Sequence, residues 1–121
     1  MRRFARLPAL VAVAAWLVPA APAHAVSPEH GNSVFRAYCV HCHGPEARGC
    51  GPAARLYRPR PANLTASTRS PEYKERIIRG GGQSMGRSPF MPPWGQQLSG
   101  EDITDIVAFL STLEKKPAAE C

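Results

Sequence analysis

The feature that most constrains this chain is a cluster of thiols and imidazoles in the stretch CVHCHGPEARGC at 39–50. It places three cysteines and two histidines within twelve residues, and the only other cysteine, Cys121, ends the chain. Such clusters hold a metal, close a disulfide or attach a cofactor. Each of these sites requires a different fold around it, so the spacing within the cluster indicates which fold to expect for the rest of the chain.

Cys39, Cys42 and His43 form the pattern C-x-x-C-H, which is the signal for covalent haem attachment. Two thiols at this spacing on a helical turn can each add to one vinyl group of haem. The histidine beside the second thiol is then carried under the ring, where its imidazole can ligate the iron. The sequence therefore predicts one haem c, attached covalently through Cys39 and Cys42 and ligated by His43.

Three other interpretations of the cluster are weaker. A zinc site needs four ligands, and beyond the motif the chain offers only the scattered Cys50, Cys121 and His30. A thioredoxin-like C-x-x-C belongs in a strand–helix context, and no strand pattern precedes this one. A structural disulfide between the two motif cysteines would be strained and would leave the adjacent histidine without a role.

Three short helices separated by long loops are expected elsewhere, without any strand. The first spans about 28–38, and the second begins with Ser70 as N-cap and stops at Gly80. The third begins with Ser99 and Asp102 as a capping box and is closed by Pro117. Its apolar residues repeat at helical spacing, with Phe109 beside them: Ile103, Ile106, Val107, Leu110 and Leu113. The loops at 44–69 and 80–98 are long for a compact domain unless they cover something.

Residues 1–25 have the three parts of a secretory signal. The basic start MRRFAR precedes twelve apolar residues, and the small-x-small site AHA follows at 23–25. The apolar run is well short of the roughly 20 residues that span a bilayer. We therefore expect cleavage after Ala25, which removes His24 and leaves a single domain over 26–121. The expected location is the periplasm, with no stable membrane insertion after cleavage.

The charge of the chain falls once this signal is removed. The full sequence has 15 basic and 9 acidic residues, a formal net charge of +6. Three of the basic residues, Arg2, Arg3 and Arg6, lie in the signal, which leaves 12 basic against 9 acidic, or +3. This excess is too small to indicate nucleic-acid binding and suits a soluble protein that meets mildly acidic partners.

With these motifs the chain resembles the monohaem class I c-type cytochromes over nearly all of 26–121. GNSVFRAYCVHCHG is similar to the opening helix of that family, and GCGPAARLYRPRPANLT to the loop after its haem motif. PFMPPWGQQLSGEDITDIVAFLSTL is similar to its distal ligand loop and terminal helix. The resemblance implies an all-α fold, with three to four short helices and long loops wrapped around one covalently bound haem. Gly31 and Phe35 of the first helix would pack against Phe109 and Leu110 of the last.

The second axial ligand has two candidates, Met85 and Met91, because Met1 leaves with the signal. A methionine in a small domain usually fills a gap in the core. Met91, however, precedes two prolines and the last helix, and the resemblance places the family's ligand methionine in this setting. His/Met ligation raises the reduction potential relative to bis-histidine ligation. It also occupies both axial positions of the iron, which favours electron transfer over catalysis, so we expect an electron-transfer protein and not an enzyme.

Partners for the haem propionates stay open. Trp94 follows the ligand loop, and its indole N–H is a candidate donor, the alternative being a place in the apolar core. Four other side chains are candidates or else solvated surface: Arg58, Arg60, Asn63 and Arg79.

Several residues of the opening cluster are left over. His41 and His30 are expected on the surface. Cys50 and Cys121 depart from the family pattern, and in an oxidising compartment two spare cysteines favour a disulfide, with free or intermolecular thiols as the alternative. This bond would close a loop of about 70 residues, and in the chain-entropy model it would stabilise the fold by roughly 4 kcal/mol at best.

The leading hypothesis is a periplasmic one-electron carrier between redox donor and acceptor proteins with acidic docking patches. The alternative is a haem-bearing subunit of a multi-protein oxidoreductase complex. A third hypothesis, an enzyme or gas sensor with an accessible iron, is disfavoured by the sequence FMPPWG around Met91. The donor, the acceptor and the reduction potential are not encoded in any motif.

Overall fold

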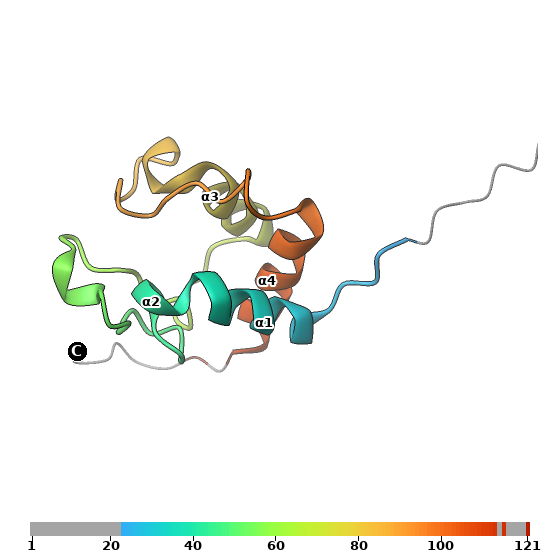
Figure 1. Cartoon of the computed structure of the whole chain (residues 1–121), viewed down its shortest axis with the longest axis horizontal. Helices are drawn as coiled ribbons and strands as arrows, with labels where there is room; N and C mark the ends of the chain where they lie inside the picture. The colour runs from blue at the N-terminus through green and yellow to red at the C-terminus, as the bar shows by residue number, and fades with distance from the viewer. Residues whose placement is uncertain (1–22, 114, 116–120) are drawn as a thin grey trace, which may run out of the picture.

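The computed structural model describes residues 23–113, 115 and 121, and within these ranges it contains helices and loops but no strand. The elements are α1 (Pro28–Tyr38), α2 (Val40–His43), the short 3-10 helix η1 (Ala54–Leu56), α3 (Pro71–Ser84) and α4 (Gly100–Thr112). Figure 1 shows α1 through the middle of the molecule, with α3 on one side and α4 crossing its first half. The expected all-α fold is confirmed. None of the helices among the described residues has the length and apolar character to cross a membrane.

The crossing of α1 and α4 depends on a glycine. A Cβ atom at Gly31 would overlap the backbone of Asp105 and lie 2.8 Å from the amide nitrogen of Ile106, so any side chain would force the helices apart. One turn further on, the rings of Phe35 and Phe109 lie 5.4 Å apart between centroids. The expected contact of Phe35 with Phe109 is thus confirmed, whereas Gly31 lies nearer the start of α4 than expected.

The predicted start and apolar face of α4 are also present. The Ser99 hydroxyl accepts from the Asp102 N–H at 3.0 Å, and an Asp102 carboxylate oxygen accepts from the Ser99 N–H at 2.8 Å, which completes the capping box. The helix ends at Thr112, and Pro117 lies outside the described residues. The core into which α4 packs consists of Val34, Phe35, Ala47, Ile78, Leu98, Ile103, Ile106, Val107 and Leu110, with Leu113 only partly buried beside it.

Helix α3 differs from the expectation at its end. Ser70 caps it as expected, but the helix does not stop at Gly80 and continues to Ser84 across a break at Gly81, where φ is +78°. The break has a tertiary cause that local sequence signals do not contain. The segment after the helix runs back against it, and the N–H of Gly82 donates to the carbonyl of Met91 at 2.9 Å.

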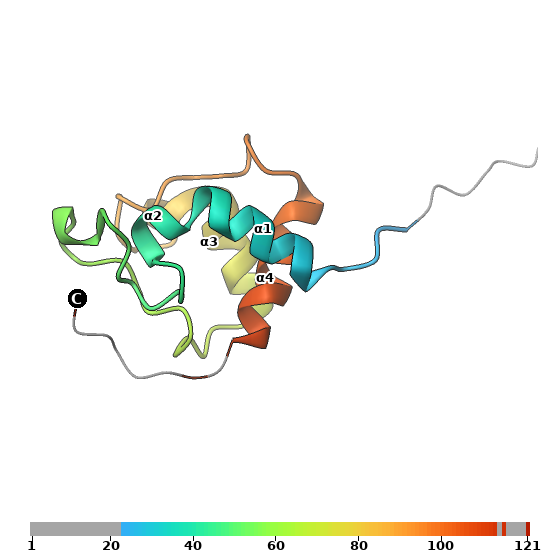
Figure 2. The ribbon, with the colours of Figure 1, turned by 60° about the horizontal axis from the view of Figure 1, so that its bottom comes forward.

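The long loop between α2 and α3 is held by internal contacts and by a covalent bond. The N–H of Leu64 donates to the carbonyl of Ala47 at 2.8 Å, which closes the loop on itself. Cys50 and Cys121 form a disulfide with their Cα atoms 5.4 Å apart, so the last residue of the chain is attached to this loop. In both Figure 1 and Figure 2 the C-terminus lies beside the loop, far from the end of α4. Of the two alternatives for the spare cysteines, the structure has the intramolecular bond.

Candidate functional site

The C-x-x-C-H motif folds as a single helical turn directly after α1. Cys39 caps the end of α1 and begins α2, and its carbonyl accepts from the N–H groups of Cys42 at 3.2 Å and His43 at 2.9 Å. Both thiols are partly buried and unbonded to other cysteines. Burial, with a smaller contribution from Cys42, raises the pKa of the Cys39 thiol to about 11, so this thiol is protonated at neutral pH.

His43 is held in the form that a metal ligand requires. Its Nδ1 lies 3.1 Å from the carbonyl oxygen of Ala62, which can only accept, so Nδ1 carries the proton. Burial lowers the pKa of His43, and the hydrogen bond to Ala62 opposes this only in part, which favours the neutral imidazole. A neutral imidazole protonated at Nδ1 has a free lone pair at Nε2, and this is the usual arrangement of a ligating histidine with its backbone partner.

The loop after α2 clamps the motif from its backbone side. The N–H of Gly49 donates to the carbonyl of His43 at 2.8 Å, and the N–H of Gly51 donates to the carbonyl of Cys42 at 3.0 Å. A Cβ atom at Gly51 would lie only 2.5 Å from the carbonyl oxygen of Val40, so this close approach requires glycine. The positions of Cys42 and His43 therefore depend on the conformation of the loop.

Met91 lies in a segment that is fixed at several points. Its carbonyl accepts from Gly82, and its own N–H donates to the carbonyl of Ser88 at 3.3 Å. Its partly buried side chain packs against the core, as does that of Cys39. It also borders an open cavity of about 360 Å³ beside the break in α3. Met85, the other candidate, is the C-cap residue that follows α3, and its N–H donates to the carbonyl of Gly82 at 3.1 Å.

Trp94 connects the Met91 segment to the motif. Its backbone N–H donates to the carbonyl of Ile78 at 2.9 Å, which fixes the segment against α3. Its indole meets the ring of Tyr38 edge-on, with 5.4 Å between centroids. Because Tyr38 directly precedes Cys39, this contact brings the segment that follows Met91 to the start of the motif.

Two of the other candidate propionate partners, Arg58 and Asn63, have contacts within the protein. Arg58 donates to the carbonyls of Arg55 at 3.2 Å and Tyr57 at 2.9 Å, so its side chain folds back on its own loop. The side-chain oxygen of Asn63 accepts from the N–H and the hydroxyl of Thr65, at 3.1 and 2.8 Å. Arg60 is exposed.

Arg79 is exposed as well. A Cβ atom built at Gly100 would be 3.7 Å from its guanidinium, which places that group at the start of α4. His41, expected on the surface, is exposed too.

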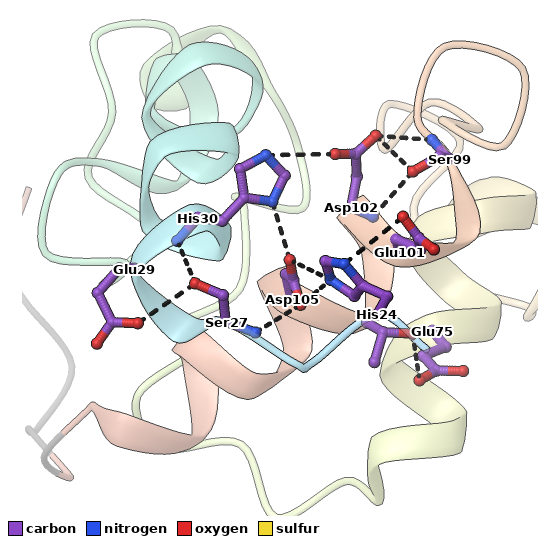
Figure 3. A network of polar contacts seen from close by, with 10 residues as sticks. His24, Ser27, Glu29, His30, Glu75, Ser99, Glu101, Asp102 and Asp105 are labelled. Atoms are coloured by element: carbon purple, nitrogen blue, oxygen red, sulfur yellow. Dashed lines mark hydrogen bonds and ion pairs between the residues drawn. The ribbon is translucent and has the colours of Figure 1, made fainter. Parts of the chain in front are cut away.

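Asp105 has a role that no sequence motif predicts. Its side chain is 0% exposed, and its carboxylate accepts from the N–H of Ser27 at 2.8 Å. Nδ1 of His30 lies 2.9 Å and Nε2 of His24 lies 3.0 Å from the same group (Figure 3). Burial raises the pKa of Asp105, but these three hydrogen bonds outweigh it and hold the pKa below its ordinary value. The sequence signal for this site was a charged residue within the apolar stripe of α4.

The expectation that His30 lies on the surface is confirmed, since its ring is half exposed. The same ring is also hydrogen-bonded to buried Asp105, and its other nitrogen lies 3.6 Å from Asp102. The reason is that Ser27 caps α1 through the His30 N–H, at 3.1 Å, which directs this turn toward α4. His24 lies within the described residues and shares the same carboxylate.

A C-x-x-C-H turn at the end of the first helix, in an all-α domain whose first and last helices cross at a glycine, defines the class of c-type cytochromes. Comparison with known proteins agrees. Residues 26–110 match the family described as cytochrome c oxidase, cbb3-type, subunit III. Cytochrome c-554(548) of Halomonas halodenitrificans is 39% identical over 79 residues, which are 63% of this chain and 84% of that protein.

A solved structure, the Kuenenia stuttgartiensis reducing HAO-like protein complex Kustc0457/Kustc0458, contains a chain with the same fold. It aligns over 76% of this chain at a TM-score of 0.60 and 27% identity, and this chain spans 48% of its length. Given these matches, the chain belongs to the cytochrome c family, whose cofactor is haem c and whose role is electron transfer.

The residues of the motif fit that cofactor. Two thiols and a neutral histidine with Nε2 free lie on one turn, and the carbonyl of Ala62 keeps the ring in the ligating form. The placement of the thiols and the orientation of the imidazole therefore come from contacts within the protein chain.

Proposed function

We propose that this protein is a periplasmic one-electron carrier. It holds one haem c attached covalently through Cys39 and Cys42, with His43 and Met91 as axial ligands. The observation that carries the proposal is the hydrogen bond from His43 to Ala62, which leaves Nε2 as the only ring nitrogen able to bind iron. When bound, haem c supplies a one-electron ferric–ferrous couple.

The surrounding residues favour electron transfer as the function, in preference to a chemical reaction catalysed at the iron. The Met91 segment is fixed through Gly82 and Ser88, so its thioether can be presented without reorganisation of the loop. A thioether ligand favours ferrous iron and raises the reduction potential. If His43 and Met91 both held the iron, a substrate would find no open position on the metal, and under this proposal the protein would not be an enzyme. We also propose that Trp94 borders the cofactor, and its ring contact with Tyr38, the residue before Cys39, supports this.

Export is supported by where the family match begins. It starts at residue 26, directly after the AHA site at 23–25. Cleavage after Ala25 would therefore release a chain that corresponds to the domain and would place it in the periplasm. The apolar run of the proposed signal falls in residues 1–22, which lie outside the described part of the structure.

Partners are proposed to be redox proteins with acidic docking patches. The loop after α2 presents three exposed arginines, Arg55, Arg58 and Arg60, beside the motif. A positive surface of this kind speeds the encounter with an acidic partner, and the effect weakens as salt is added.

A second function, the haem-bearing subunit of a multi-protein oxidoreductase, has specific support. The matching family is described as an oxidase subunit, and the solved chain with the same fold comes from a protein complex. Size exclusion of native extract distinguishes the two. A carrier elutes at the size of the single chain, whereas a subunit elutes with its complex.

A redox titration combined with carbon monoxide binding tests the carrier. The proposal predicts a reversible one-electron couple and slow binding of carbon monoxide to the reduced protein, because Met91 must leave first. Fast binding would contradict the proposal and indicate an iron with an open position, as in a sensor or a peroxidase.

A further inference from the structure

The disulfide between Cys50 and Cys121 attaches the end of the chain to the loop that contacts the haem-binding motif. Cys50 lies between Gly49 and Gly51, whose N–H groups hold the carbonyls of His43 and Cys42. The covalent link to the end of the chain is thus made at the residue between the two donors that clamp the motif.

The same loop also holds the imidazole of His43. A Cβ atom at Gly49 would collide with the carbonyl of Pro61 and lie 3.3 Å from the carbonyl of Ala62, so the Gly49 backbone lies directly against the acceptor of the His43 hydrogen bond. A continuous path of contacts therefore runs from the disulfide through Gly49 to the Ala62 carbonyl and from there to Nδ1 of His43.

This part of the loop has little intrinsic stiffness. Gly44 and Gly49 have φ values of +78° and +83°, and Ala47 has a φ of +56°. Glycine is conformationally permissive, and alanine at positive φ is held only by its surroundings. On its other side the end of the chain is fixed by Arg55, whose Nε donates to the Cys121 carbonyl at 3.3 Å.

We infer that Cys50 and Cys121 are positioning residues for the axial histidine: their disulfide fixes the loop whose Ala62 carbonyl orients His43, and so helps to set the reduction potential. This inference rests on the proposed function. A hydrogen bond at Nδ1 makes an imidazole a stronger donor to its metal, which favours the ferric state. Loosening the loop weakens this bond, so loss of the disulfide raises the reduction potential.

The test compares the haem-loaded wild type with Cys50→Ala/Cys121→Ala. Two readouts are taken, the reduction potential and the amide hydrogen exchange of Gly49 and Gly51. We expect a higher potential and faster exchange at both glycines. Ser99→Ala is the matched control, because it loses the cap of α4 and some stability without touching the loop; it should lower the melting temperature and leave both readouts unchanged.

If the double variant fails to fold, the wild-type disulfide can be opened with a phosphine and its thiols blocked by alkylation before the same measurements. A lower melting temperature with an unchanged reduction potential and unchanged exchange at Gly49 and Gly51 would overturn the inference. The disulfide would then stabilise the fold without positioning the histidine. Failure of the proposed function is seen separately, in the wild type alone, as the absence of covalently bound haem.

Discussion

Nδ1 of His43 donates a hydrogen bond to the carbonyl oxygen of Ala62, 3.1 Å away. The two residues belong to different elements, the turn of α2 and the far side of the following loop. Their contact fixes which nitrogen of the imidazole is free, and it ties the chemistry of the motif to the conformation of a loop without regular structure. Backbone partners of this kind orient metal-binding histidines and tune their strength as donors.

Substituting Met91 by alanine should abolish the near-infrared absorption band of methionine-ligated ferric haem. Carbon monoxide should then bind the reduced protein fast, because one axial position is open. Met85→Ala is the matched control and should keep the band. A band that survives in Met91→Ala and disappears in Met85→Ala would assign the ligand to Met85.

Gly31→Ala should destabilise the fold by about 1–3 kcal/mol, the usual range for overpacking. The added methyl group would overlap the backbone of Asp105 and push α1 away from α4. Denaturant unfolding measures the change. Ser33→Ala, on the exposed face of the same helix, is the control and should stay within about 0.5 kcal/mol of the wild type. Equal stability of the two variants would mean that the helices do not cross at Gly31.

Asp105→Ala should lower the free energy of unfolding by about 1–3 kcal/mol, because the N–H of Ser27 and the ring of His30 lose their buried acceptor. Neither bond involves a residue of 1–25, so both would remain after the proposed cleavage behind Ala25. Unfolding of the variant in denaturant gives this cost, and an unchanged free energy of unfolding would show that the carboxylate is not buried in this network.

Asp105 should also contribute to the pH dependence of stability. In the full-length chain, where Ser27, His30 and His24 all contact the carboxylate, its folded pKa is depressed. Its contribution is therefore complete above the unfolded carboxyl pKa of about 3.9 and is lost as pH falls through the folded pKa. Asp105→Asn cannot titrate and should lack this component of acid destabilisation. Identical acid unfolding profiles of the wild type and Asp105→Asn would refute the depressed pKa.

Removing the disulfide should lower the free energy of unfolding by at most about 4 kcal/mol, as loop-closure entropy predicts for a link across 71 residues. Cys50→Ala/Cys121→Ala unfolded in denaturant with haem bound gives this value. If two thiols can be alkylated in the untreated native protein in addition to any unattached motif cysteine, the bond is absent in solution.

The parts of the fold that local signals control were predictable. The capping box of Ser99 and the apolar stripe after it gave α4, and the motif spacing gave the turn of α2, because both depend on neighbours in sequence. The end of α3 was not predictable, since Gly81 breaks the helix where the distant Met91 segment returns.

The same limit applies to the site. The identity of Ala62 as the partner of His43, and of His30 as a partner of Asp105, depends on loops whose paths no periodicity describes. The disulfide could be proposed by counting cysteines, but its place between the two clamping glycines could not. That Asp105 is buried depends on how α1 approaches α4, which only the folded chain sets.

The most direct test of the account is the attachment of haem to the motif. The native protein is extracted with acidified acetone and then digested, and its peptides are analysed by mass spectrometry. The account predicts that haem stays with the protein and that the peptide containing Cys39, Cys42 and His43 carries its mass through both cysteines. Haem that passes into the acetone, or a motif peptide found unmodified, would contradict it.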